Sequence, residues 1–178
     1  MSSAGCDTAA APNAPVANMT SAYGGIRWES GNSRAGQYEH GQSRIGGSIW
    51  QTPLRYIENS PLFYVDRVKT PVLIMSNDAD GAVPWYQGIE LFVGLRRFGK
   101  EAYLLNYNGD GHNPRKRANQ LDVDRRMQQF FAHHLKGEAA PAWMRSGIPF
   151  VQKGRDQLQP PVTAPAVGGV TAQEATKP

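Results

Sequence analysis

The amino-acid sequence predicts an α/β fold built on a parallel sheet. Two short apolar runs, at 71–76 and 102–107, are each followed by a polar turn that contains glycine. Each turn leads into a segment whose apolar residues recur with helical spacing, at 84–98 and at 117–136. A repeated strand–turn–helix order joins parallel strands through a right-handed crossover.

Each of these elements carries its own local signals. The run at 71–76 is apolar without alternation, which is typical of a strand buried on both faces. The helix at 84–98 is followed by Gly99 and the helix at 117–136 by Gly137, and glycine is the residue that most often ends a helix. The sequence therefore marks both where these helices lie and where they stop.

Composition excludes several classes of protein. The chain has 178 residues, with 19 Lys and Arg against 15 Asp and Glu, and its net charge of +4 is dispersed. No basic tract indicates nucleic-acid binding, and no apolar run is long enough for a membrane-spanning helix. A single cysteine excludes a disulfide framework and a cysteine-rich zinc site. We expect no cofactor, no metal, no nucleic-acid partner and no membrane partner.

The chain divides into three parts by composition. Residues 1–13 are small, polar and interrupted by proline, which predicts a loose N-terminal arm. Residues 151–178 hold almost no large apolar side chain, which predicts a disordered tail, and the folded unit is placed at 14–150. Within it, residues 18–60 are a stretch of glycines and scattered aromatics. Those aromatics either wall a pocket or, more commonly, cover a core.

An acid and a histidine follow the two predicted strands. Asp80 lies in the turn after the first strand and His112 in the turn after the second, 32 residues later. The carboxyl ends of parallel strands meet at one edge of a sheet, where catalytic loops gather. A carboxylate bonded to one imidazole nitrogen fixes the tautomer and makes the other nitrogen a base. We therefore expect Asp80 and His112 to be hydrogen-bonded; on residue type alone, Asp80 is equally well explained as a turn residue.

Residues 60–114 resemble the end of the catalytic domain of the prolyl oligopeptidase (S9) family, in the branch of dipeptidyl peptidases and acylaminoacyl peptidases. The resemblance rests on Asp80 followed by Val83-Pro84, then on Gln87 and His112, and it extends over about 14–150. It implies the terminal part of an α/β-hydrolase fold, with three parallel strands near 14–17, 71–76 and 102–107. It also implies that Asp80 is the acid and His112 the base of a Ser-His-Asp triad.

The resemblance bears on two further residues. The spacing to Val83-Pro84 favours Asp80 over Asp78 as the acid, although Asp78 stands as the alternative. Tyr23 falls where tyrosines of dipeptidyl peptidases lie near the substrate pocket, which implies a weak case for substrate contact. His133-His134 lie near the end of the last helix, where surface histidines are commoner than metal ligands.

The serine nucleophile of the family lies in a Gly-x-Ser-x-Gly-Gly turn before the segment that matches residue 14. Residues 1–13 contain no such turn, so we expect the nucleophile to be absent from this chain. Ser33 lies in a Gly-x-Ser-x-Ala sequence, but no buried strand precedes it and Gly36 interrupts any helix after it. We interpret Ser33 as a loop serine.

Two functional hypotheses follow. In the first, the chain is the acid–base part of a serine peptidase, with a peptide substrate and the missing N-terminal part of the hydrolase domain as its partners. In the second, it is an inactive fragment or half of a split hydrolase that acts as an interaction module and can self-associate. The sequence shows no secretory signal, intact relatives are commonly exported, and the compartment is left open.

Overall fold

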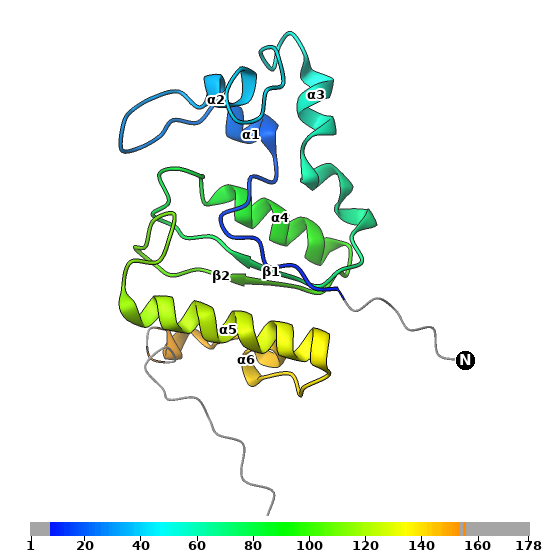
Figure 1. Ribbon diagram of the computed structural model, residues 1–178, viewed down its shortest axis with the longest axis vertical. Coiled ribbons are helices and arrows are strands. Elements are labelled where there is room, and N and C mark those ends of the chain that lie inside the picture. The colour runs from blue at the N-terminus through cyan, green and yellow to red at the C-terminus, as the bar shows by residue number, and fades with distance from the viewer. Residues whose placement is uncertain (1–7, 154, 156–178) are drawn as a thin grey trace, which may run out of the picture.

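The computed structural model describes residues 8–153 and 155, and its centre is a small parallel sheet (Figure 1). Strand β1 (Val72–Met75) pairs with strand β2 (Ala102–Leu105), and Val72 lies opposite Ala102. The N–H groups of alternate β1 residues point to opposite sides. On one side Val72 N–H donates to Glu101 at 3.0 Å, and on the other Leu73 N–H donates to Ala10 at 2.9 Å. The strands predicted at 71–76 and 102–107 are confirmed.

The third strand was expected at 14–17, and this expectation is wrong. The segment that runs beside β1 is residues 10–13, which form isolated parallel bridges at Ala10 and Asn13. The Ala10 N–H donates to the carbonyl of Pro71, the residue before β1, and the Ala14 N–H donates to the Met75 carbonyl. Pro12 lies midway between them and has no N–H group. The proline therefore breaks the ladder into two bridges.

The N-terminal arm is also shorter than predicted. Residues 8–13 were expected to be loose, but they are held along β1 by backbone hydrogen bonds, including Met75 N–H to the Pro12 carbonyl at 3.1 Å. Small side chains do not prevent such pairing, because the bonds use only the backbone. Residues 1–7, the rest of the predicted arm, lie outside the described residues.

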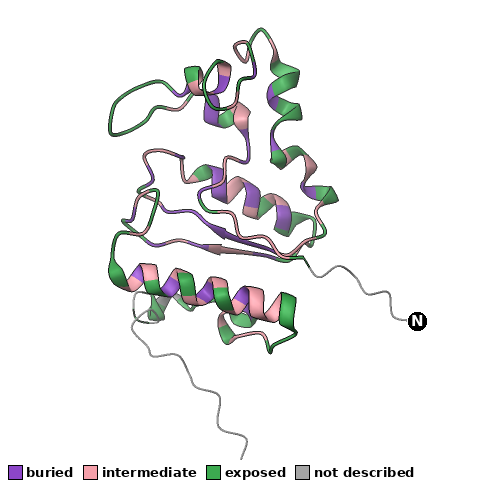
Figure 2. Cartoon of the chain, viewed as in Figure 1, coloured by how far each residue is buried: buried purple, intermediate pink, exposed green. Residues whose placement is uncertain are grey.

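Two long helices cover the two faces of the sheet (Figure 1). Helix α4 (Tyr86–Arg97) packs on the face of Val72 and Ile74, and helix α5 (Arg117–Lys136) packs on the face of Leu73 and Met75. This alternation explains why β1 is buried at every position (Figure 2). The helix at 117–136 is confirmed as predicted, and α4 lies within the 84–98 range.

Residues between 19 and 67 form a separate layer above α4 (Figure 1). It consists of helices α1 (Met19–Tyr23), α2 (Ala35–Glu39) and α3 (Pro53–Glu58) and the 3-10 helix η1 (Pro61–Arg67). Its tyrosines pack on one another in a small core of their own, made of Ala22, Tyr23, Tyr38, Ile45 and Tyr56. Tyr23, Tyr38 and Tyr56 thus form a core, the commoner of the two uses considered, whereas Trp28 and Trp50 are exposed.

The chain continues beyond α5 with two short elements that the sequence did not reveal. Helix α6 (Ala142–Ser146) packs Met144 and Trp143 against the α5 side of the sheet, and the 3-10 helix η2 (Phe150–Gln152) follows. The predicted tail lies outside the described residues except for 151–153 and 155. Within the described ranges, no helix combines the length and apolar character needed to cross a bilayer.

Candidate active site

Asp80 and His112 lie in the loops that leave the carboxyl ends of β1 and β2. Their side chains meet, with His112 Nδ1 2.9 Å from Asp80 Oδ2. The hydrogen bond expected between these two residues is therefore present. The Asp80 side chain is 1% exposed and the His112 side chain 48%, so a buried carboxylate holds a ring that reaches solvent.

The Asp80 carboxylate is fixed by its own loop. Its Oδ1 atom accepts hydrogen bonds from the Ala82 and Val83 N–H groups, both at 2.8 Å. These bonds leave Oδ2 directed at His112.

The arrangement suits a histidine base. A carboxylate at Nδ1 accepts a hydrogen bond from that nitrogen, which places the lone pair of the neutral ring on Nε2. Among the described residues, Asp80 is the one hydrogen-bond partner of the His112 ring. Nε2 is therefore open to take a proton from a reacting group, and the carboxylate stabilises the imidazolium that forms.

Asn77 joins the two loops, and sequence reasoning missed it. This buried side chain accepts from the Tyr107 N–H at 3.0 Å and donates to the Gly111 carbonyl at 2.9 Å. Gly111 precedes His112, so the amide fixes the histidine loop against the acid loop. The signal in the sequence that could have identified Asn77 is its place as a polar residue just after a buried strand, but a residue there is equally typical of a turn.

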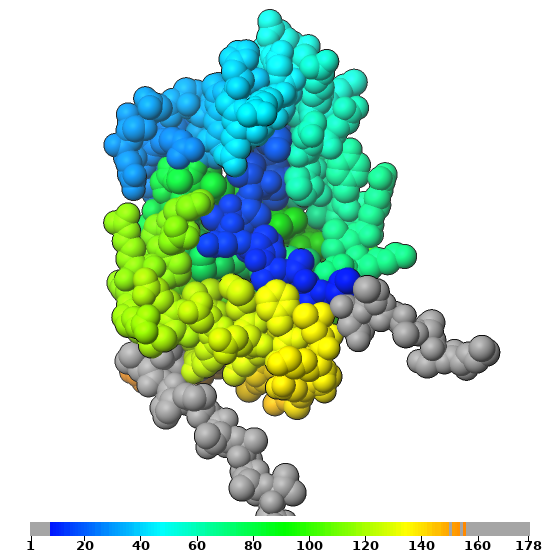
Figure 3. Space-filling model, viewed as in Figure 1, coloured from blue at the N-terminus to red at the C-terminus, as the bar shows by residue number. Residues whose placement is uncertain are grey.

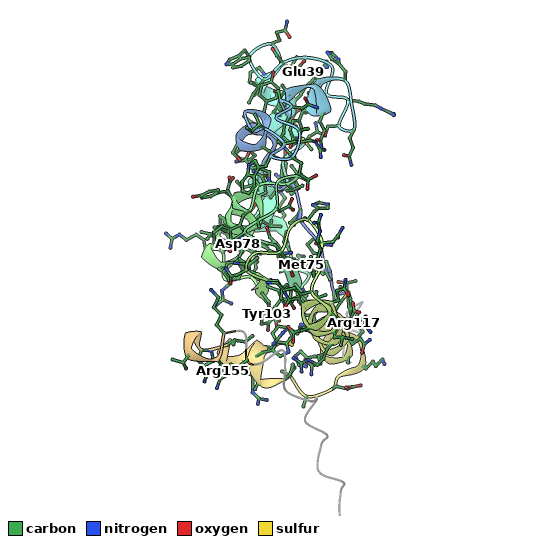
Figure 4. The ribbon with its side chains drawn as sticks, turned by 90° about the vertical axis from the view of Figure 1, so that its left-hand side faces the viewer. Glu39, Met75, Asp78, Tyr103, Arg117 and Arg155 are labelled. Atoms are coloured by element: carbon green, nitrogen blue, oxygen red, sulfur yellow. The ribbon has the colours of Figure 1, made fainter. Side chains whose placement is uncertain are left out.

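Asp78, the alternative acid, has other partners. It accepts hydrogen bonds from the Gly109 N–H and the Asn108 amide. Burial works against its charged form, but the bonds from Gly109 and Asn108 outweigh this and hold the pKa of Asp78 below its ordinary value. Figure 4 shows Asp78 beside the sheet in the middle of the molecule. Asp78 therefore ties the two loops together, and Asp80 contacts the histidine.

A small cavity of about 110 Å³ lies against the pair. Residues from three segments line it, among them Glu29, Asp80, Gly81, His112, Asn113 and Arg115. The segment that carries Glu29 is docked on the acid loop, because the Trp28 N–H donates to the Gly81 carbonyl at 3.2 Å. A Cβ atom at Gly81 would lie 2.9 Å from the Trp28 Cβ, so this close approach requires glycine.

Ser33 lies in the turn region that carries Trp28 and Glu29. It forms an isolated antiparallel bridge with Ile26, and its Oγ atom accepts from the Ala35 N–H at 3.2 Å. The residue is exposed and lies just before helix α2, with neither a buried strand before it nor a long helix after it. These contacts are those of a loop serine.

Tyr23 is buried in the aromatic core of the upper layer. Its ring packs edge-on against Trp50 and Tyr56, and its hydroxyl donates to Glu39. That hydrogen bond is the main reason why the pKa of Tyr23 is raised to about 12. Figure 4 places Glu39 at one end of the molecule, far from Asp78, and Tyr23 does not line the cavity beside His112. The structure does not bring Tyr23 to the acid–histidine pair.

A parallel sheet covered by helices on both faces, with an acid and a histidine in successive loops at its carboxyl edge, is part of an α/β-hydrolase fold. The chain belongs to the prolyl oligopeptidase family, whose model matches residues 8–138. The match includes the segment 10–13 beside β1.

Sequence similarity to individual peptidases supports this family membership. An uncharacterised peptidase of Bacillus subtilis, YuxL, is 30% identical over 105 residues, which cover 56% of this chain and 14% of that protein. The acylamino-acid-releasing enzyme of Rattus norvegicus is 35% identical over 65 residues, or 36% of this chain and 8% of the enzyme. The chain thus matches a small share of either relative's length.

Solved structures support the fold. A puromycin-hydrolysing peptidase of Mycobacterium tuberculosis superposes with a TM-score of 0.60 at 22% identity, over 71% of this chain and 18% of that one. The acylaminoacyl peptidase of Pyrococcus horikoshii gives a TM-score of 0.58 at 22% identity, over 84% and 22%. At this level of identity the likeness describes the fold.

Proposed function

We propose that this chain supplies the acid and the base of a serine-type peptidase that cleaves peptide amide bonds. The observation that carries the proposal is the 2.9 Å contact between Asp80 Oδ2 and His112 Nδ1. His112 Nε2 takes the proton of the attacking serine hydroxyl and later delivers it to the leaving amine. Asp80 keeps the ring in the required tautomer.

In this proposal, the attacking hydroxyl belongs to a serine outside this chain. Ser33, the serine with the most suggestive sequence context, is bonded to Ala35 N–H in an exposed turn. Within the described residues, the hydrogen bonding of the His112 ring involves Asp80 and no serine. The chain by itself then hydrolyses neither peptides nor simple esters, because an acid and a base without a nucleophile cannot form the covalent intermediate.

The second candidate is an interaction module, half of a split hydrolase. The observation that favours it is the segment 10–13, which pairs with β1 on one side and has no strand on its other side among the described residues. Figure 3 shows this N-terminal segment, in blue, at the surface between the upper layer and α5. An open backbone edge accepts a further strand, either from the rest of the hydrolase domain or from a second copy.

The reactivity of His112 tests the acid–base assignment in the chain as it stands. Diethyl pyrocarbonate modifies the unprotonated ring nitrogen of histidine, and mass spectrometry resolves each site. Asp80→Asn is expected to slow modification of His112 several-fold, because the amide no longer holds the proton on Nδ1. The matched control Asp78→Asn removes the neighbouring negative charge but keeps a side-chain oxygen that can accept from the Gly109 N–H. The two loops should therefore stay tied, and the His112 rate should be unchanged. Equal rates in the wild type and Asp80→Asn would refute the assignment.

A fluorophosphonate probe tests the nucleophile. The purified chain is expected to remain unlabelled, since the probe reports only an activated serine. Stoichiometric labelling of Ser33, abolished by Ser33→Ala, would show that the chain carries its own nucleophile and would overturn this half of the proposal.

A further inference from the structure

A second group of polar side chains lies at the opposite end of the sheet from His112. Glu101 directly precedes β2, and His133 and His134 lie in the last turn of α5. Each residue offers one ligand atom, and these atoms all lie within 4.8 Å of one another. Because His112 follows the carboxyl end of β2 and Glu101 precedes its amino end, this group is separate from the acid–histidine pair.

His134 is the most enclosed of the three. Its side chain is 11% exposed, and its Nε2 atom is buried without a hydrogen-bond partner in the described part of the chain. This nitrogen faces Glu101 Oε1 at 3.5 Å. A buried polar atom left in this way requires another partner.

His133 is oriented by a bond on its other nitrogen. Its Nδ1 atom lies 2.6 Å from the Glu138 carbonyl oxygen, which can only accept, so Nδ1 carries the proton. The lone pair is then on Nε2. Histidines that bind metals commonly donate their second ring N–H to a backbone carbonyl in this manner, because the bond fixes both tautomer and ring orientation.

Glu101 is held as well. Its Oε1 atom accepts the Tyr103 hydroxyl at 2.6 Å, and Tyr103 is a β2 residue packed against Phe130 and Trp143. The carboxylate is therefore fixed to the sheet, whereas both imidazoles belong to α5. A ligand that bound all three would join the start of β2 to the end of α5.

We propose that Glu101, His133 and His134 bind one divalent transition-metal ion of the Zn²⁺ class. Two ligand atoms at about 2.0–2.2 Å from a tetrahedral ion lie roughly 3.4 Å apart, and His134 Nε2 and Glu101 Oε1 already have a comparable separation of 3.5 Å. The ligand atom of His133 lies within 4.8 Å of the other two, so it must move closer to them when an ion binds. Two imidazoles and one carboxylate suit Zn²⁺, Co²⁺, Ni²⁺ and Cu²⁺, and they leave a fourth position for water. The alternative is the expectation from the sequence, that His133-His134 are surface histidines and bind no metal.

Calorimetric titration with Zn²⁺, on protein that carries no histidine tag, tests the site. The wild type is expected to bind one ion with micromolar or tighter affinity, and Glu101→Gln, His133→Ala and His134→Ala should each weaken binding at least tenfold. His40→Ala is the matched control, since the exposed His40 lies 3.5 Å from Glu39 and offers one imidazole and one carboxylate. It should bind as the wild type does.

A second readout keeps the test decisive if His134→Ala fails to fold. Zn²⁺ should raise the melting temperature of the wild type and of His40→Ala, but not of Glu101→Gln, whose side chain is about half exposed. Co²⁺ should give the visible absorption of a tetrahedral site. Absence of stoichiometric Zn²⁺ binding by the wild type, or affinity in Glu101→Gln and His133→Ala equal to that of the wild type, would overturn the proposal. Neither result depends on peptidase activity.

Discussion

Asn77 sets the position of His112 although it does not touch the ring. Its amide satisfies one N–H in the loop after β2 and one carbonyl next to His112, and it is itself 1% exposed. The contact between Asp80 and His112 depends on how these two loops are held. Asn77 is therefore a positioning residue for the pair.

Replacing Asn77 with Ala should both destabilise the chain and slow the reaction of His112 with diethyl pyrocarbonate. Each buried group left unsatisfied costs about 1–3 kcal/mol, which denaturant unfolding will measure. The slower His112 reaction separates positioning from mere stability. Asn108→Ala is the control: it removes an exposed amide from Asp78, but the Gly109 N–H still bonds Asp78 and ties the loops, so the His112 rate should be spared. An unchanged His112 rate in Asn77→Ala would contradict the positioning role.

Because of Tyr23, the free energy of unfolding is predicted to depend on pH in the alkaline range. Its folded-state pKa is raised to about 12 against about 10 in the unfolded chain. The neutral hydroxyl is thus favoured by folding, and its stabilising effect is complete below pH 10 and is lost as pH rises towards 12. Tyr23→Phe should lose less stability over that interval than the wild type does. If the free energy of unfolding, measured with denaturant, fell equally in the wild type and in Tyr23→Phe between pH 10 and 12, the Tyr23–Glu39 hydrogen bond would be rejected as the cause.

The acid and the histidine could be found from the sequence because residue type and strand order are both visible there. Asp80 and His112 each follow an apolar run by a few residues, and parallel strands bring such turns together. Asn77 could not be found, since its role depends on a backbone N–H and a carbonyl from a loop some 30 residues away. The metal-ligand group was missed because Glu101 and the end of α5 are far apart in the chain.

Helix α4 approaches β1 closely at one glycine. A Cβ atom on Gly88 would lie 2.3 Å from the Ser76 Cβ, well inside contact distance. Ser76 directly follows β1 and precedes Asn77, so the helix presses on the start of the acid loop. Gly88 is one of the buried residues of α4.

Gly88→Ala should therefore destabilise the chain by about 1–3 kcal/mol, the range for overpacking a close contact. Gly36 is the matched control, because it also lies in a helix and a Cβ atom added there would meet nothing within 4 Å. Gly36→Ala should be neutral or stabilising by up to about 1 kcal/mol. Thermal unfolding of both variants checks the pair, and a Gly88→Ala variant as stable as Gly36→Ala would show that α4 can move away without cost.

Helices and strands were predictable where the sequence has a periodic apolar pattern and a turn or glycine that marks the end of the element. β1, β2, α4 and α5 each combine an apolar pattern with a turn or a terminal glycine, and all four are confirmed. The third strand was misplaced because its pattern is weak. Residues 10–13 pair through their backbone with few large side chains, so only the neighbouring β1 reveals their conformation.

The described part of the chain is a sheet that is covered on both faces and has no further strand beside the segment 10–13. Beyond the segment 10–13 the described residues provide no further strand, and several large apolar side chains are exposed, among them Trp50, Leu54, Val93, Leu121 and Leu135. Open edges and exposed apolar side chains both favour association. We expect the isolated chain to self-associate or to be only marginally stable.

Size-exclusion chromatography with light scattering measures this directly. Masses above that of one chain, rising with protein concentration, are the expected result. A concentration-independent monomer that melts sharply and cooperatively above about 60 °C, at the upper end for mesophilic domains, would contradict it and show a self-sufficient domain.

We propose that Asp80 holds His112 as a base, and nitrogen NMR of the His112 ring observes the protonation of each ring nitrogen. The neutral ring should carry its proton on Nδ1, bonded to Asp80, with Nε2 unprotonated. In Asp80→Asn this preference should be lost, while Asp78→Asn should keep it. A wild-type ring protonated on Nε2, or a tautomer unaffected by Asp80→Asn, would contradict the account.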